Sequence, residues 1–243
     1  MTLPATDINS FFENFASWAQ EVDDAWTRLA LGDDDEESPE QLLIAIAEFA
    51  SVVTGIEEKD ANSLNLDIEM LGSYGQELLD KLIGMAEAAK MNDSVEEMEQ
   101  LALPIAAWVA RNGGELKNLP PMVNALAYLA NNLQSPEDMA QLCDLMNKLI
   151  EAVSPSVFED EDPTDNNRPW RVLLLNRAIV ATRSHSVKLI EPAYDSIVEL
   201  LPIDAPSFFE EGIQQMDILG YPEHVRDIMN HYYLLHSVSR TLH

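Results

Sequence analysis

Hydrophobic side chains recur every three or four positions along most of the chain, which is the period of a helix with one buried face. Between Ile8 and Leu29 the apolar side chains share one face, and Asp23 and Asp24 fall on the opposite side. A strand-like alternation occurs only over 64–70. We interpret it as the entry to a helix, with a short extended segment as the alternative. The pattern therefore predicts an all-α fold.

About ten helices are expected from the periodicity. Most connections between them are short, and short connections make neighbouring helices antiparallel. We therefore expect helical hairpins, arranged as an α-solenoid-like stack or a compact helical array. Pro104 and Pro192 lie inside two of these helices and should kink or split them. The expected spans are 7–30, 39–54, 63–90, 95–112, 119–133, 136–153, 169–183, 187–201, 205–219 and 222–239.

Several helix ends are marked by capping residues. Ser38, Ser94 and Ser135 are each followed three residues later by a side chain that can complete a capping box. Proline directly follows Ser38 and Ser135, and it favours the first helical turn. Gly220 suits the end of one helix, and the next should begin at Pro222.

The segment 154–168 interrupts the helical pattern because it is rich in proline and acidic residues and has no periodicity. We expect an acidic helical-hairpin region over 1–153, a loop or linker over 154–168, and further helical hairpins over 169–243. A single continuous domain is the alternative. Charge changes at about the same place: residues 1–163 hold 7 basic and 33 acidic side chains, whereas residues 164–243 hold 7 and 10.

The composition excludes several classes of protein. The chain has 243 residues, 47 % of them hydrophobic, with 14 basic and 43 acidic side chains and a formal net charge of −29. Such a charge repels nucleic acid and anionic lipid. The single cysteine allows no internal disulfide. No secretory signal is recognisable, and the longest apolar stretch, 42–53, is short for a membrane span. We expect a cytoplasmic protein without a cofactor, in an oligomeric state that the sequence does not reveal.

The last expected hairpin resembles a tetratricopeptide unit. Gly212 and Tyr221 are nine residues apart, as are the small residue of the first helix and the aromatic residue at the turn in that family. The segment 219–223 is similar to the family's inter-helix turn. His224 and Gln215 depart from the pattern, where the family has a small and an aromatic residue. The resemblance, which covers about 35 residues, implies a concave surface that binds a partner and no catalytic residues.

Arginine and histidine are concentrated in the C-terminal part. Arg171, Arg177 and Arg183 lie about 120° apart around one helix, so each is expected to pair with a different acidic neighbour. A phosphate or carboxylate site using one or two of them is the alternative. His185 lies between two serines at a turn, where Ser186 suits a helix N-cap better than a nucleophile.

Other candidate residues have an ordinary explanation beside a functional one. His224, His231 and His236 are spaced wrongly for a helical metal pair. Tyr232 and Tyr233 could anchor a partner or pack in the core. The acidic runs 33–37 and 159–162 lack the spacing of a calcium loop and resemble solvated segments. The sequence therefore predicts no catalytic residue and no metal site.

The expected function is a non-enzymatic scaffold or adaptor that binds a protein or peptide in a helical groove, mainly within residues 170–243. The candidate partner-binding residues are Arg171, Arg177, Arg183, His185, His224, Tyr232 and Tyr233. One alternative is an acidic mimic of nucleic acid that antagonises a basic protein. Another is a small-anion-binding sensor or enzyme, which the convergence of these arginines and histidines in space would favour.

Overall fold

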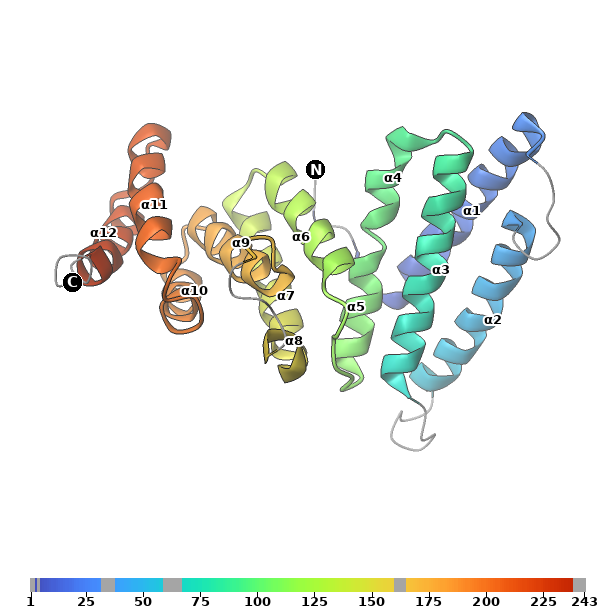
Figure 1. Cartoon of the computed structure of the whole chain (residues 1–243), viewed down its shortest axis with the longest axis horizontal. Coiled ribbons are helices and arrows are strands. Elements are labelled where there is room, and N and C mark those ends of the chain that lie inside the picture. The colour runs from blue at the N-terminus through green and yellow to red at the C-terminus, as the bar shows by residue number, and fades with distance from the viewer. Residues whose placement is uncertain (1–2, 4, 32–37, 59–66, 160–164, 238–243) are drawn as a thin grey trace. The chain divides into compact units, whose positions relative to one another are not determined.

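The computed structural model of the chain describes residues 3, 5–31, 38–58, 67–159 and 165–237 (Figure 1). The fold is all-α, as predicted, and the described residues contain no β-strand. The helices in these residues are α1 (Ile8–Leu29), α2 (Pro39–Glu58), α3 (Ile68–Ala88), α4 (Asn92–Glu99), α5 (Ala102–Arg111), α6 (Pro120–Asn132), α7 (Pro136–Glu151), α8 (Pro155–Glu159), α9 (Pro169–Arg183), α10 (Val187–Leu200), α11 (Ala205–Leu219) and α12 (Glu223–Ser237).

The chain divides into two compact units, which are described separately. The N-terminal unit comprises 4–126 and 148–157, and the C-terminal unit comprises 1–3, 127–147 and 158–243. Helices α6, α7 and α8 contribute residues to both units.

In the N-terminal unit, α5 is the most deeply buried helix. Residues 102–109 of α5 are all buried, and the helix packs against α1 and α3. Helices α1, α2 and α3 also pack against one another, and the ring of Phe49 meets the rings of Phe12 and Tyr74 edge-on, with centroids 5.6 and 5.5 Å apart. Aromatic pairs of this geometry stabilise a core beyond the area that they bury.

Helix α2 is apolar over most of its surface. By length and composition alone, Pro39–Glu57 is the one described segment that could cross a membrane, with a mean hydropathy of 1.3. One third of this segment, 33 %, is buried inside the protein. A core helix of a soluble protein meets the same two criteria.

In the C-terminal unit, α9 pairs with α10, α11 pairs with α12, and α10 contacts α12. Aromatic rings fill the space between these helices. The ring of Tyr194 lies 5.2 Å from the rings of both Phe209 and Tyr232. Trp170 is buried as well.

At two of the three predicted capping boxes the serine accepts the N-cap hydrogen bond. The backbone N–H of Gln41 donates to Ser38 Oγ (3.3 Å), and that of Asp138 donates to Ser135 Oγ (3.0 Å). The prediction for Ser94 is wrong. Helix α4 begins at Asn92, and the Ser94 N–H donates to the carbonyl of Met91 (2.9 Å) within the first turn.

The prolines and glycines act differently from one helix to another. The helix predicted over 95–112 is split into α4 and α5, because Pro104 lacks the N–H that would continue the ladder. Pro192 does not split α10. Helix α2, expected over 39–54, continues through Gly55 to Glu58. The expected entry segment at 63–66 lies outside the described residues.

Candidate functional site

A groove opens between α9 and α11 in the C-terminal unit. It has a volume of about 290 Å³, and we call it the α9/α11 groove. Its main lining residues are Ile179, Arg183, Phe208, Gly212, Leu219 and Tyr221. All of them belong to the region in which the sequence predicted a partner-binding surface.

Two aliphatic side chains of the groove are exposed to solvent. Ile179 on α9 is 44 % exposed, and Leu219 at the end of α11 is 64 % exposed. Buried side chains of Thr182, Met216 and Met229 lie behind them. The groove therefore offers apolar contact area to a ligand without any rearrangement of the core.

A glycine permits the close packing of α11 against α12 beside the groove. A Cβ atom built on Gly212 would lie 2.4 Å from Met229 Cε and 2.8 Å from its Sδ. The absence of a side chain lets Met229 pack directly against the backbone of α11. The turn that follows α11 uses Gly220 with φ +67°, a conformation that favours glycine.

The charged groups of the groove are Arg183 and Glu211. The Arg183 guanidinium donates to the backbone carbonyls of Ala130 and Leu133, the latter at 2.7 Å. It thereby binds carbonyls at the C-terminal end of α6, where positive charge is favoured. Arg183 is held by carbonyl groups and not by the acidic side chain that we expected.

Two of the predicted histidines meet next to Tyr221, which lines the groove. The carbonyl of His185 accepts a hydrogen bond from His224 Nε2 (3.0 Å), so the Nε2 atom carries a proton. The ring of His185 lies edge-on to Tyr221, with centroids 5.4 Å apart. Burial, followed by the charge of His224, lowers the pKa of His185, whereas Glu137 opposes the shift. Burial raises the pKa of Tyr221, and the charge of Arg183 opposes it.

The sequence indicates only part of this cluster. His185 and His224 are candidate residues, and Arg183 is expected near one of them if the chain binds an anion. Tyr221 lies close to both Arg183 and His185. The sequence predicts it only as a residue of the turn. Its distance in sequence from His185 gives no signal that the two rings touch.

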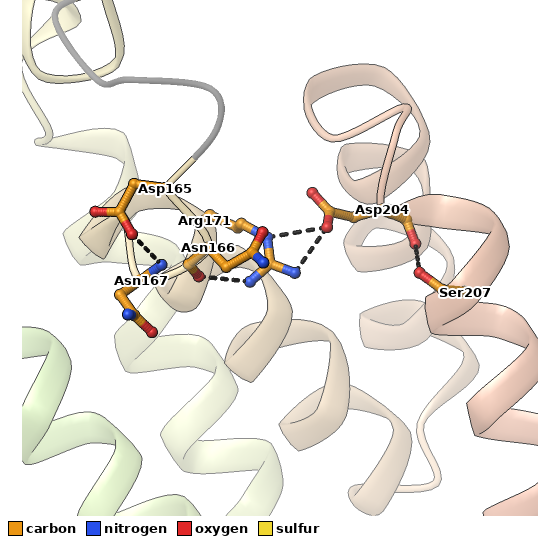
Figure 2. A network of polar contacts seen from close by, with 6 residues as sticks. All are labelled: Asp165, Asn166, Asn167, Arg171, Asp204 and Ser207. Carbon is orange, nitrogen blue, oxygen red and sulfur yellow. Dashed lines mark hydrogen bonds and ion pairs between the residues drawn. The ribbon is translucent and has the colours of Figure 1, made fainter.

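Arg171 lies in a separate polar network (Figure 2). Its Nε and Nη2 atoms donate to Asp204 Oδ1 at 2.9 and 2.7 Å, and its Nη1 donates to the Asn166 carbonyl at 2.7 Å. Asp204 is the N-cap residue of α11, so this arginine connects the start of α9 to the start of α11. The pairing of Arg171 with a carboxylate confirms the expectation for this residue.

Arg177 occupies a third position. Its Nε donates to Asn147 Oδ1 (2.7 Å), and its Nη1 donates to Ser196 Oγ (2.9 Å). The three arginines thus connect different pairs of elements and do not converge on one point. Ser184, the other polar residue near His185, donates to the carbonyl of Ala181 and accepts from the N–H of Ser186, which is the bonding of a turn.

Tyr232 joins the aromatic core and also reaches a carboxylate. Its hydroxyl donates to Asp195 Oδ1 (2.6 Å), and its ring lies 5.4 Å from that of Phe209. Burial and the bond to Asp195 raise its pKa. Tyr233 is half-buried, and neither tyrosine lines the groove. The acidic run at 33–37 and most of the run at 159–162 lie outside the described residues.

Comparison with known proteins finds no relative: no protein-family model, no curated protein and no solved structure matches the chain.

Proposed function

We propose that this protein is a non-enzymatic interaction scaffold whose α9/α11 groove binds an apolar segment of a protein or peptide partner. The observation that carries the proposal is the pair of exposed aliphatic side chains, Ile179 and Leu219, on the two sides of a concave surface. Removing such side chains from water is the main driving force of association.

The size of the groove is compatible with a side chain of a larger partner. Pockets that enclose drug-sized ligands have volumes of roughly 300–1,000 Å³, and this groove has about 290 Å³. That volume accommodates one or two large apolar side chains. Interfaces commonly gain most of their affinity from a few side chains seated in such pockets.

The helix order also supports a tetratricopeptide-like mode of binding. The α9–α10 and α11–α12 pairs are consecutive hairpins, and the groove lies between the first helices of the two. Stacked hairpins bind their partners through surfaces of this kind. The positions of the three arginines favour this proposal over an anion-binding sensor or enzyme, because Arg171 and Arg177 do not line the groove.

Two adjacent residues of α11 provide a matched test. Leu219 lines the groove, whereas Ile218 does not and is 76 % exposed. Leu219→Gln and Ile218→Gln therefore make similar surface changes, each with a stability cost within about 0.5 kcal/mol. The tagged full-length protein and both variants are used to capture partners from a lysate of the host at about 50 and about 300 mM salt, followed by mass spectrometry.

We expect a protein that wild type and Ile218→Gln retain at the higher salt and that Leu219→Gln loses. Ile179→Gln, on the other side of the groove, should lose the same protein. Equal retention by all variants would contradict the proposal. Basic proteins held only at the lower salt would favour the nucleic-acid mimic instead, because exposed charge contacts are screened at the higher salt.

A further inference from the structure

A second groove lies in the N-terminal unit, between α3, α5 and the segment 112–119. Its volume is about 440 Å³, and we call it the α3/α5 groove. A backbone bridge holds the segment in place: the Leu116 N–H donates to the Ala152 carbonyl (2.8 Å), and the Ser154 N–H donates to the Leu116 carbonyl (3.0 Å). One wall of the groove is therefore tied to the chain that follows α7.

The floor of the α3/α5 groove is apolar. It includes Ile105 and Val109 of α5 and Leu116 of the bridged segment, all of them buried. Met70, at the start of α3, lines the same groove and is 61 % exposed. Methionine is a flexible and polarisable side chain that adapts to apolar ligands of varied shape.

The walls of the groove are acidic. Its carboxylates are Asp67, Glu69, Glu77, Asp80 and Glu115, and its one cationic side chain is Lys117, a formal net charge of −4. The Lys117 ammonium binds Glu69 Oε2 at 2.5 Å. The bond and charge of Glu69, with smaller effects of Glu115 and Asp67, raise the pKa of Lys117. Glu77 and Asp80 lie further along α3, away from this ion pair.

The combination of concave shape, apolar floor and acidic walls decides the kind of ligand. A cleft lined by one sign of charge concentrates the field and attracts groups of the opposite sign. In the described residues, no three carboxylate, histidine or cysteine side chains lie close enough to hold a metal ion, so the negative charge is spread along the groove. A second copy of the chain, with a net charge of −29, would be repelled.

We propose that the α3/α5 groove is a docking site for a basic segment of another protein, in which an apolar residue is flanked by lysine or arginine. The apolar residue lies on the floor beside Met70, and the flanking cations face Glu77 and Asp80. The site is independent of the α9/α11 groove, which lies in the other unit.

The test identifies ligands directly from random sequences. A phage-displayed library of random 12-residue peptides is selected on the immobilised full-length protein and, in parallel, on Ser73→Trp. Ser73 is exposed and lines the groove, so an indole there fills the cavity and leaves every carboxylate in place. Ser51→Trp, on an exposed position of α2 outside the groove, is the matched control.

The expected result is enrichment on wild type of peptides that place lysine or arginine around an apolar residue. Binding of a labelled enriched peptide, measured by fluorescence anisotropy, should weaken about tenfold or more in Ser73→Trp and less than about twofold in Ser51→Trp. Enriched peptides without excess positive charge, or with undiminished affinity for Ser73→Trp, would overturn the proposal. A selection that enriches no peptide at all would also overturn it.

A second pair of variants tests the charges. Glu77→Gln combined with Asp80→Asn removes two charges from the groove, and Glu13→Gln combined with Glu48→Gln removes two from exposed positions elsewhere in the same unit. Only the groove pair should weaken the peptide several-fold at about 50 mM salt and reduce its salt dependence. Equal effects of the two pairs would show attraction to net charge alone and would refute a specific groove. Leu219→Gln should leave this binding unchanged, so failure of either proposal can be recognised separately.

Discussion

A buried pair of hydroxyl groups joins α9 to α10 behind the α9/α11 groove, and its contribution to stability can be predicted. Thr182 Oγ1 lies 2.7 Å from the carbonyl of Ala178 and 2.7 Å from the hydroxyl of Tyr194. The threonine hydroxyl has one proton, which it donates to the carbonyl. Tyr194 must therefore donate to Thr182.

The direction of this bond makes the two single substitutions unequal. Tyr194→Phe removes the donor, and Thr182 keeps its bond to Ala178, so we expect a loss of about 1 kcal/mol in the free energy of unfolding. Thr182→Val leaves the tyrosine hydroxyl buried without an acceptor, which costs about 2 kcal/mol. The double variant contains no orphaned donor. It should lose only about 1 kcal/mol, where additivity predicts about 3, a coupling of about 2 kcal/mol.

Urea denaturation followed by circular dichroism measures the four free energies of this cycle. Tyr233→Phe is the control, because the Tyr233 hydroxyl makes no hydrogen bond within the described residues, and it should change stability by less than about 0.5 kcal/mol. Additive losses would show that the two hydroxyls do not interact. A larger loss for Tyr194→Phe than for Thr182→Val would show that the donor is assigned the wrong way round.

Because the pKa of Tyr194 is raised, the protein should lose stability in alkali. Burial is the main cause that raises the pKa of Tyr194 above the ordinary value of 10.0. The unfolded chain therefore releases this proton first, and the stability that the neutral phenol contributes is complete below pH 10 and lost as the pH rises above it. The free energy of unfolding should fall above pH 10 by up to about 1.4 kcal/mol per pH unit for one such group. Tyr194→Phe should make the fall less steep, and an unchanged slope would contradict this assignment.

Three further substitutions should lower stability by amounts that urea denaturation can measure. Gly72→Ala places a Cβ 2.4 Å from Val109 Cγ2, and the overpacking should outweigh the gain of about 1 kcal/mol in helix propensity; combining it with Val109→Ala should cost less than the two single losses together. Ser135→Ala removes the N-cap of α7 and should cost about 1 kcal/mol, whereas Ser135→Asp should cost much less. Arg171→Lys cannot reproduce the two bonds to Asp204 Oδ1 and should also cost about 1 kcal/mol; no loss would show that the network in Figure 2 is not stabilising.

Helix positions were predictable because they depend on local signals. Ser38 and Ser135 precede a proline and an apolar helical face, so capping, backbone and burial all favour the same start. Ser94 satisfied the capping pattern alone. There, α3 ends at Ala88, and the chain turns through Lys90 with φ 62° into a helix that has already begun at Asn92. The start of α4 thus depends on where the preceding helix ends, which a four-residue pattern does not contain.

The residues of the candidate sites were less predictable, for a different physical reason. Arginine, histidine and tyrosine are common in binding sites and are therefore chosen as candidates from a sequence. Here the side chains of Arg171, Arg177 and Tyr232 form hydrogen bonds within the protein. The α9/α11 groove instead depends on Ile179 and Leu219, which continue the same apolar periodicity as their buried neighbours. Whether such a residue is covered depends on the rotation of each helix about its axis and on which helix packs next to it.

This distinction explains where a binding surface can arise in a stack of hairpins. The two helices of a hairpin bury one apolar face against each other. A second apolar face is covered only if a neighbouring hairpin packs closely against it. At Gly212 the missing side chain lets Met229 of α12 pack directly against α11, and the same residues line a gap towards α9 that the surrounding side chains do not fill. Close packing and an unfilled groove can therefore occur next to each other along one helix that carries only ordinary core residues. A site of this kind carries no catalytic or charged motif, which is why variants of exposed aliphatic residues, and not of the arginines, are the decisive test of function.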